Sequence, residues 1–584
     1  MPTFSDLLKN FYEKEPQRVA LYVLQSGQPD QPVTYRQLLQ GAAAYARAFE
    51  QHGVQPGEVV VLILQHGYDL FYAFFGAVLH GAIPSIMPFL TEKLLPERYR
   101  ADLAALVGIT QPSAIVTYPD FASEVHAALQ PASPPKSGGT LPKSGSTSVP
   151  PQNGGTSVRA VIVSDKIGEP LDPDFAALGG MRRSPQDIVL LQHSSGTTGL
   201  QKGVALTHQA VFNQLESYSQ ALRLVPEDVI VSWLPLYHDM GLIAGFLMPI
   251  LWGIPLVIMS PFEWVRAPYR LMQAVSRYKG TLSWLPNFAY NFCAQKIRER
   301  DLAGVDLSSW RAISNCSEPM RCASHQAFYE RFRAYGLRYE ALATCYAMAE
   351  NVFAVTQGGL DGPVTVDEID RDAFQIERQA RPAGPRHPDR PSIKMLSAGR
   401  PVRGTEVKVV ADDGSLLPER GVGEVALRSD CMLVGYYHRP DANEKAFRDG
   451  WYLTGDYGYM ADGEVYVSGR KKDLIIVGGK NIYPQDLETL AMEVEGVHPG
   501  RVVAFGVFNE EAGTEEVVIV AEVDTENEEE REQIAASIRQ TVTRGSAVAL
   551  RNVYITGPHW IAKTSSGKTA RLANRDKYLK EIAD

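Results

Sequence analysis

The sequence has few cysteines and no large excess of either charge. Its 584 residues include five cysteines and no Cys-x-x-Cys pair, so neither a disulfide framework nor a zinc site is indicated. The formal net charge of -10 argues against an extended nucleic-acid surface, because domains that bind nucleic acids are usually basic. The first residues contain no basic segment followed by an apolar run, so no secretory leader is expected. These absences predict a cytoplasmic protein that binds no nucleic acid.

The chain also lacks an unbroken apolar run of membrane-spanning length. The uncharged stretch between Asp239 and Glu263 is interrupted by glycines and prolines, which predicts an amphipathic helix, a turn and a short buried strand. The stretch from Tyr68 to Leu90 has the same helix-glycine-strand pattern and follows the apolar strand sequence VVVLIL. Two such units predict a βαβ architecture without an integral membrane segment.

Changes in composition divide the chain into parts. Residues 131–157 are almost entirely Pro, Ser, Gly and Thr, which predicts a disordered surface insertion, with a partner-docking linker as the alternative. Residues 359–394 show little periodicity and are interpreted as an extended loop or insertion. Strand patterns then predict a β-rich lobe. The expected fold class is α/β, with a large N-terminal domain (1–471) of βαβ-type sheets and a small α+β domain (472–584).

One segment, from His193 to His208, has the composition of an anion-binding loop. It follows the strand-like sequence DIVLLQ, and its small residues allow backbone N–H groups and hydroxyls to surround a phosphate. Lys202 adds a compact positive charge, and the spacing is not that of a Walker A motif. The alternative, an exposed hairpin turn, would not need this combination. The small residues of the loop are Ser194, Ser195, Gly196, Thr197, Thr198 and Gly199.

A second segment, IAKTSSGKTAR, contains Lys568 and matches a nucleoside-triphosphatase loop except that Ala562 stands where the first glycine is required. Such a loop must open a helix in a parallel sheet, and too few residues follow for that arrangement. We interpret the segment as a flexible loop that presents one lysine. Taken alone, the segment favours the alternative, in which Lys568 is a solvated surface residue.

Four further segments end apolar stretches with polar side chains, as expected where loops line a cleft: LPLYHDMGL, NCSEP, CYAMAEN and WYLTGDYGY. No H-E-x-x-H, G-x-S-x-G or G-x-G-x-x-G motif is present. Metalloprotease, α/β-hydrolase and dinucleotide-dependent chemistry therefore have no local support, and phosphate chemistry remains.

Together and in this order, these segments closely resemble the adenylate-forming superfamily, which includes acyl-CoA synthetases, fatty acyl-AMP ligases, adenylation domains of peptide synthetases and luciferases. SSGTTGLQKG is similar to its phosphate loop, with Gln201 where proline is usual, and YAMAE is similar to its Y-G-x-T-E segment. GRKKDLI and KTSSGK match two of its most specific motifs. The resemblance covers nearly the whole chain and implies ATP and Mg²⁺ as cofactors.

The resemblance also implies roles for individual residues. Lys568, His238 and Glu350 would be catalytic, with Glu350 also binding magnesium, and Lys472 would be the hinge of a mobile C-terminal domain. The phosphate loop would hold ATP together with further nucleotide-binding residues, namely Lys202, Ser317, Glu318, Pro319, Tyr346, Asp456 and Arg470. Tyr237 would gate the acyl cleft. The candidate wall residues of the acyl pocket are Trp233, Met240, Phe288 and Phe292, with ordinary core residues as the equal alternative.

The substrate implied is a fatty acid, because YHDMGL and the following apolar helix resemble fatty acyl ligases more than amino-acid adenylation domains. The long connection after Glu350, with VDEIDRDAF, resembles fatty acyl-AMP ligases, in which an insertion restrains the small domain and the acyl group passes to an acyl carrier protein. A fatty acyl-CoA synthetase is the alternative acceptor reaction. A second alternative is an inactive nucleotide- or acyl-binding protein on the same scaffold.

Overall fold

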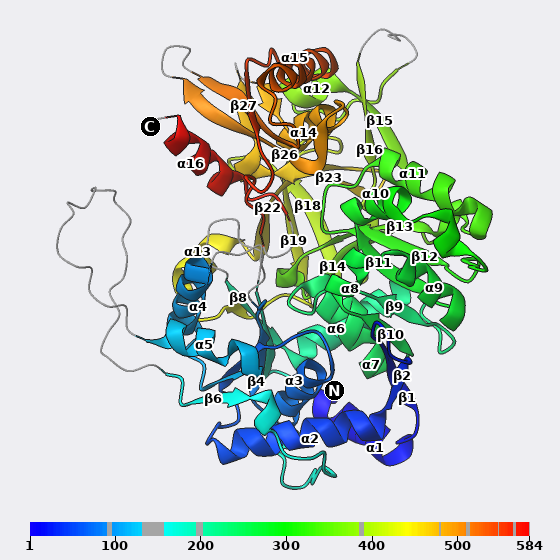
Figure 1. The fold of residues 1–584 in the computed structure, drawn as a ribbon, viewed down its shortest axis with the longest axis vertical. Coiled ribbons are helices and arrows are strands. Elements are labelled where there is room, and N and C mark those ends of the chain that lie inside the picture. Colours follow the sequence, from blue (N-terminus) through cyan, green and yellow to red (C-terminus); the bar gives the residue numbers. More distant parts are fainter. Residues whose placement is uncertain are drawn as a thin grey trace, which may run out of the picture. The chain divides into compact units, whose positions relative to one another are not determined.

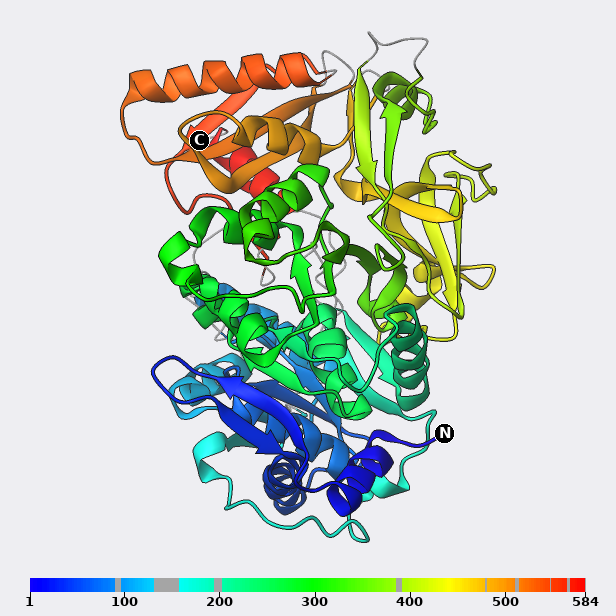
Figure 2. The same cartoon turned by 90° about the vertical axis from the view of Figure 1, so that its right-hand side faces the viewer.

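The computed structural model describes residues 1–89, 96–130, 157–193, 202–384, 391–477, 480–509, 514–546, 548–564 and 568–582. The chain forms two compact units. The first comprises Met1–Val211, Pro235–Tyr237 and Leu433–Pro440, and the second comprises Phe212–Leu234, His238–Met432 and Asp441–Asp584. Figure 1 and Figure 2 show their elements coloured along the sequence.

A mostly parallel sheet forms the centre of the first unit (Figure 1). Its strands in spatial order are β20 (Gly435–Tyr436), β8 (Gly203–Thr207), β7 (Ile188–His193), β4 (Ile83–Ile86), β3 (Val59–Ile63), β5 (Ala114–Thr117) and β6 (Ala160–Val163). β20 and β8 run antiparallel to their neighbours. β3, β4 and β5 are buried along their whole length, as expected for parallel strands covered on both faces.

The helices of the first unit are α1 (Phe4–Lys14), α2 (Tyr35–Gln51), α3 (Tyr68–His80), α4 (Pro96–Thr110) and α5 (Ala122–Leu129), and a hairpin of β1 (Val19–Leu24) and β2 (Gln31–Thr34) follows α1. α3 ends where Gly81 takes a left-handed conformation (φ +88) that other residues rarely adopt. β3, α3 and the parallel strand β4 confirm the βαβ unit predicted for this region.

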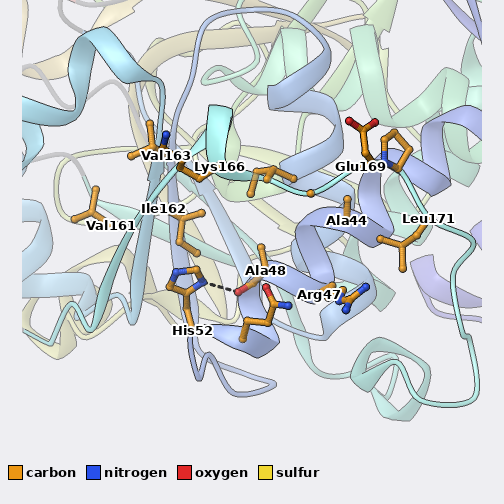
Figure 3. Close-up of a pocket in the computed structure, with 14 residues that line it drawn as sticks. Ala44, Arg47, Ala48, His52, Val161, Ile162, Val163, Lys166, Glu169 and Leu171 are labelled. Carbon is orange, nitrogen blue, oxygen red and sulfur yellow. Dashed lines mark hydrogen bonds between the residues drawn. The ribbon is translucent and has the colours of Figure 1, made fainter.

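The first unit contains a cavity of about 490 Å³ between α2 and residues 161–171 (Figure 3). Ala44, Ala48 and the strand β6 supply apolar wall, and Arg47 and Lys166 supply positive charge. The His52 ring lies against the backbone, with Nδ1 2.8 Å from the Ala48 carbonyl oxygen. None of the site residues predicted from the sequence lines this cavity.

The second unit is built on another largely parallel sheet. Its strands in spatial order are β17 (Arg400–Pro401), β14 (Ala354–Gly358), β13 (Leu342–Ala347), β12 (Ala312–Cys316), β11 (Leu282–Pro286), β9 (Ile230–Ser232) and β10 (Leu256–Met259). β10, β9, β11, β12 and β13 are parallel to their neighbours in that order. The helices are α6 (His208–Ala221), α7 (Met248–Trp252), α8 (Pro261–Arg266), α9 (Tyr269–Tyr278), α10 (Asn287–Lys296) and α11 (Cys322–Phe332).

The apolar stretch after Asp239 confirms the predicted helix, turn and buried strand but not the predicted amphipathicity. It forms a wide helical segment, η4 (Met240–Leu247), in which every residue is buried, followed by α7 and β10. The segment is apolar on all sides, which is the pattern of a helix enclosed within a core rather than lying on its surface. No helix among the described residues is long and apolar enough to cross a membrane.

The predicted β-rich lobe is present in the second unit. Its strands are β18 (Thr405–Val410), β19 (Gly423–Ser429), β22 (Trp451–Ala461), β21 (Phe447–Arg448) and β23 (Glu464–Arg470), with α13 (Pro440–Ala446) in the connection. Residues 359–394 are more regular than a loop, since they contain β15 (Val366–Asp370) and α12 (Arg371–Ile376) before the antiparallel strand β16 (Ser392–Leu396). The 131–157 insertion lies outside the described residues except for Ser157.

The residues from Ile475 onward form α+β structure, and buried side chains between Ile475 and Leu550 pack into one hydrophobic core cluster. The core is built on β26 and β27 and is covered by α14 and α15. α15 begins at three glutamates after the N-cap Asn527, where negative charge is favourable. The elements are β24 (Ile475–Val477), β25 (Lys480–Ile482), α14 (Pro484–Met492), β26 (Val497–Asn509), β27 (Thr514–Val523), α15 (Glu528–Gly545), β28 (Asn552–Thr556) and α16 (Arg571–Glu581).

Candidate active site

Polar residues follow the carboxyl ends of neighbouring strands in the second unit's sheet. His238 and Asp239 come after β9, Glu318 comes after β12, and Glu350 comes after β13. Because parallel strands end at one edge of the sheet, ligands of such sheets bind beyond these ends. The fold therefore brings to one edge several side chains that are far apart in the sequence.

Lys568 lies close enough to this edge for its positive charge to lower the pKa values of His238, Asp239 and Glu318. Burial, together with the neighbouring positive charge of Lys568, lowers the pKa of His238 to about 3. Burial raises the pKa of Asp239 and of Glu318, and Lys568 opposes both shifts. The imidazole of His238 is therefore neutral at neutral pH, and the ammonium group of Lys568 stands among carboxylates and buried polar groups.

The backbone on both sides of Lys568 is held by local hydrogen bonds. The Lys568 carbonyl accepts from the Thr564 backbone N–H at 2.7 Å, and the Lys568 N–H donates to Thr564 Oγ at 3.1 Å. Lys563 and Thr569 form an antiparallel bridge. These bonds support the prediction of a loop that presents this lysine.

Asp239 and Glu350 are the acidic pair of the site. Asp239 caps η4 by accepting a hydrogen bond from the Met240 backbone N–H at 2.8 Å, and the charge of Glu350 adds to the raised pKa of Asp239. No group of three or more His, Cys, Asp or Glu side chains within the described part of the chain could hold a metal ion. Since Mg²⁺ is commonly bound by one or two carboxylates together with substrate phosphates, Glu350 fits a Mg²⁺ that arrives with a nucleotide.

The predicted adenine loop has a strained backbone. Ser317 takes φ +71, a left-handed conformation that is uncommon for residues other than glycine. Its hydroxyl lies 3.8 Å from the sulfur of Met240, and Glu318 accepts a hydrogen bond from the Phe288 backbone N–H at 2.9 Å. Pro319 is exposed. Strain of this kind persists only where neighbouring groups hold the backbone in place, and it is frequent at functional sites.

Asp456, Arg470 and Tyr346 form a second cluster. The register of β22 and β23 places Asp456 opposite Arg470, and the Arg470 Nε atom lies 2.7 Å from Asp456 Oδ1. The Tyr346 hydroxyl donates to Asp456 Oδ2 at 2.6 Å. The charge of Asp456 raises the pKa of Arg470, and the charges of Tyr346 and Glu350 also contribute, so this cluster adjoins the acidic pair.

The predicted hinge residue Lys472 lies in a short helical turn, Lys471–Asp473, directly after β23. The two residues beside it form ion pairs. Lys471 Nζ lies 3.0 Å from Glu424 Oε2, and Asp473 Oδ2 lies 3.1 Å from Arg571, which also contacts Glu488 at 2.7 Å. Arg571 therefore connects the segment after the hinge to the loop of Lys568, a role that the sequence reasoning missed.

The phosphate loop from Ser194 to Gly199 lies outside the described residues. Lys202, which follows it, belongs to the first unit and places its ammonium group 4.4 Å from the centre of the Tyr436 ring. Tyr237 also belongs to the first unit, and burial raises its pKa to about 12.

Three of the five predicted acyl-pocket residues belong to one aromatic cluster. The Trp233 ring stacks on Trp264 with centroids 3.5 Å apart, and Phe288 and Phe292 pack against Trp264 at 6.2 and 5.3 Å. Met240, which follows Trp233 by seven residues in the sequence, is buried in η4. Trp264, the centre of the cluster, was missed because one tryptophan in an apolar sequence gives no functional signal.

His325, behind the adenine loop, is buried against the Tyr290 ring, and burial lowers its pKa to about 4. In the unfolded chain its pKa is near 6.5, so acidification from about 6.5 to 4 favours unfolding by up to about 3 kcal/mol for this residue. We expect urea denaturation at a series of pH values to show a smaller loss of stability on acidification for His325→Gln than for the native protein. The exposed-histidine variant His498→Gln should follow the native curve. An acid dependence of His325→Gln as steep as the native one would contradict this expectation.

Comparisons with known proteins identify the family. A family described as AMP-binding enzyme matches residues 8–437. Medium-chain-fatty-acid–acyl-carrier-protein ligase JamA of Moorena producens is 29% identical, covering 100% of this chain and 96% of JamA. Long-chain-fatty-acid–AMP ligase FadD32 of Mycobacterium marinum is 31% identical, covering 91% of this chain and 86% of FadD32.

Solved structures give the same result for the fold. A chain from a study of fatty acyl-adenylate ligases from E. coli and L. pneumophila superposes with a TM-score of 0.86 at 27% identity, covering 100% of this chain and 98% of that one. The α/β fold class and the resemblance inferred from the motifs are thereby confirmed. The family match spans more than half of the sequence, and the chain therefore belongs to the AMP-binding enzyme family.

Proposed function

We propose that this protein activates a fatty acid with ATP to an acyl-adenylate and transfers the acyl group to the phosphopantetheine thiol of an acyl carrier protein. The observation that carries the proposal is the position of Lys568, whose charge acts on His238, Asp239 and Glu318 at the carboxyl edge of the sheet. The full-length similarity to JamA and FadD32 supports the choice of substrate class.

In the first step, a carboxylate oxygen of the fatty acid bonds to the α-phosphorus of ATP while the bond from that phosphorus to the bridging oxygen breaks and pyrophosphate leaves. The carboxylate and the triphosphate repel one another, and negative charge grows on the phosphoryl oxygens. A fixed ammonium group at Lys568 lowers this barrier because it is already in place when the charge develops. Mg²⁺ held by Glu350 would neutralise phosphate charge, and the neutral imidazole of His238 would lie beside the reacting carboxylate.

The nucleotide is held by the remaining predicted residues. Asp456, fixed by Arg470 and Tyr346, would accept hydrogen bonds from the ribose hydroxyls. Ser317, Glu318 and Pro319 would flank the adenine, and the loop from Ser194 to Gly199 with Lys202 would hold the phosphates. The acyl chain would lie along the predicted pocket residues Trp233, Tyr237, Met240, Phe288 and Phe292, where each buried methylene contributes about 0.8 kcal/mol before other terms.

In the second step, the carrier thiol attacks the acyl carbonyl carbon and AMP leaves with the electrons of the broken carbon–oxygen bond. We propose that residues 472–584 turn about Lys472 between the two steps, as a small domain separate from 1–471.

The five cysteines are free thiols in the structure, which supports a cytoplasmic location.

The acceptor is tested by supplying ATP, Mg²⁺ and dodecanoate with either a phosphopantetheinylated acyl carrier protein or CoA, and measuring products by mass spectrometry. We expect dodecanoyl-AMP in both reactions and a thioester mainly on the carrier protein. Abundant dodecanoyl-CoA would favour the alternative, a fatty acyl-CoA synthetase. Absence of AMP from both reactions would favour an inactive nucleotide- or acyl-binding protein.

A further inference from the structure

The 315–321 loop, NCSEPMR, carries the three residues proposed to flank adenine, and it is attached at both ends to a single side chain. The Asn287 carbonyl oxygen, Oδ1, accepts a hydrogen bond from Asn315 Nδ2 at 3.0 Å and another from the Arg321 backbone N–H at 3.1 Å. The middle of the loop is attached to the next residue of the same helix, because Glu318 accepts from the Phe288 backbone N–H.

The register of the sheet explains why Asn287 can reach both ends. In the parallel pair β11 and β12, Leu285 lies opposite Asn315 and Pro286 lies opposite Cys316. Asn287 is the first residue beyond β11, so it stands beside the point where β12 becomes the loop. It is also the first residue of α10, which fixes its backbone.

The Asn287 side chain is itself oriented by a buried partner. Its Nδ2 group donates to Ser324 Oγ at 3.1 Å, and Asn291, one turn further along α10, donates to the same oxygen at 3.1 Å. Asn315 also contacts His325 Nε2 at 3.1 Å, and the low pKa of His325 keeps that ring neutral. Both lone pairs of Asn287 Oδ1 are used by the loop, which is the full accepting capacity of a side-chain amide oxygen.

The loop needs such an attachment because its backbone is strained. Ser317 holds a left-handed φ of +71 between the two ends that Asn287 binds. A strained residue relaxes unless its surroundings fix it, and here the fixed points are Asn315 on one side and Arg321 on the other. Without Asn287 the Arg321 end of the loop would lose this hydrogen bond, and Asn315 would lose its side-chain bond to Asn287 while its backbone stayed paired in β12.

We infer that Asn287 is a positioning residue that holds the 315–321 loop in the conformation that receives the adenine of ATP. The inference rests on the proposed function, because the position of adenine beside the 315–321 loop is part of that proposal. Asn287 acts through the loop and need not touch the nucleotide. Losing it should weaken ATP binding selectively and leave fatty-acid binding unchanged.

The test compares Asn287→Leu with Asn291→Leu in the full-length protein. Both variants remove a hydrogen bond to Ser324, but only Asn287→Leu removes the two bonds to the loop. Two lost hydrogen bonds, one of them from a buried amide, predict a KM for ATP about tenfold or more higher for Asn287→Leu. The KM for dodecanoate should match that of Asn291→Leu, and the thermal midpoint should lie below that of Asn291→Leu because two more hydrogen bonds are lost. Asn287→Asp keeps both accepting positions and should recover a large part of the ATP affinity.

A second measurement separates positioning of the base from general damage. The native preference for ATP over GTP, measured as the ratio of kcat/KM values, should fall in Asn287→Leu and stay native in Asn291→Leu. A KM for ATP within twofold of that of Asn291→Leu, or an equal rise in KM for ATP and dodecanoate, would overturn the inference. Failure of the proposed function would show differently, as absence of acyl-adenylate from the native protein itself.

Discussion

Lys568→Ala should reduce acyl-adenylate formation by about a hundred- to a thousandfold, which is the usual effect of removing one donor aimed at developing negative charge. The variant loses the positive charge that acts on His238, Asp239 and Glu318. The measurement is fatty-acid-dependent exchange of labelled pyrophosphate into ATP, which reports the first step without any acceptor. Circular dichroism and the thermal midpoint should stay native, because the loop is held by backbone bonds to Thr564.

Lys563→Ala is the matched control for this prediction. Lys563 lies on the same loop and carries the same charge, but it lowers the pKa of Glu318 less than Lys568 does. We expect its effect on exchange to be much smaller than that of Lys568→Ala. Native exchange in Lys568→Ala, or equal losses in both variants, would show that Lys568 has no special part in the first step.

Asp456→Ala should weaken ATP binding by about a hundredfold. The Asp456 side chain is only 7% exposed, and the variant leaves both Arg470 and the Tyr346 hydroxyl without this carboxylate. The expected loss of affinity comes from the hydrogen bonds that the carboxylate is proposed to accept from the ribose hydroxyls, because a hydrogen bond to a charged group contributes about 1.5–3 kcal/mol. Equilibrium binding of a non-hydrolysable ATP analogue measures the change directly.

Tyr346→Phe is the corresponding control. It removes one hydrogen bond to Asp456 and keeps the ion pair, so ATP binding should weaken only about three- to tenfold. If Asp456→Ala bound the analogue as tightly as the native protein, then Asp456 would be a structural residue of the β-rich lobe. If both variants lost the same ATP affinity, then the orientation of the Asp456 carboxylate would depend entirely on the Tyr346 hydroxyl.

The elements with strong periodicity could be predicted from the sequence. The apolar strand β3, the helix α3 that ends at Gly81, and the acidic start of α15 all have local signals, and each is present. The prediction that the helix after Asp239 is amphipathic was wrong, because every residue of η4 is buried. Which elements enclose a helix depends on the tertiary fold, and the local sequence pattern does not show it. Residues 359–394 have a composition typical of loops, but they contain the strand β15 and the helix α12.

Within the candidate site, the sequence motifs point to the charged residues but not to the residues that orient them. Lys568, Asp456 and Glu350 stand in recognisable motifs, whereas Asn287 and Arg571 act through partners distant in the chain. Asn287 joins two strand ends only once β11 and β12 are in register, and Arg571 meets Asp473 only after the C-terminal region folds. The one available signal for Asn287 is its place as the first polar residue after the apolar sequence LSWLP, which the sequence analysis did not single out.

The central claim is that this protein joins a fatty acid to AMP. The most direct measurement is to incubate the purified native protein with ATP, Mg²⁺ and dodecanoate, without any thiol acceptor, and to analyse the products by mass spectrometry. The account predicts dodecanoyl-AMP and pyrophosphate in equal amounts. Release of ADP and phosphate, or ATP that remains unchanged while the protein binds both substrates, would contradict it.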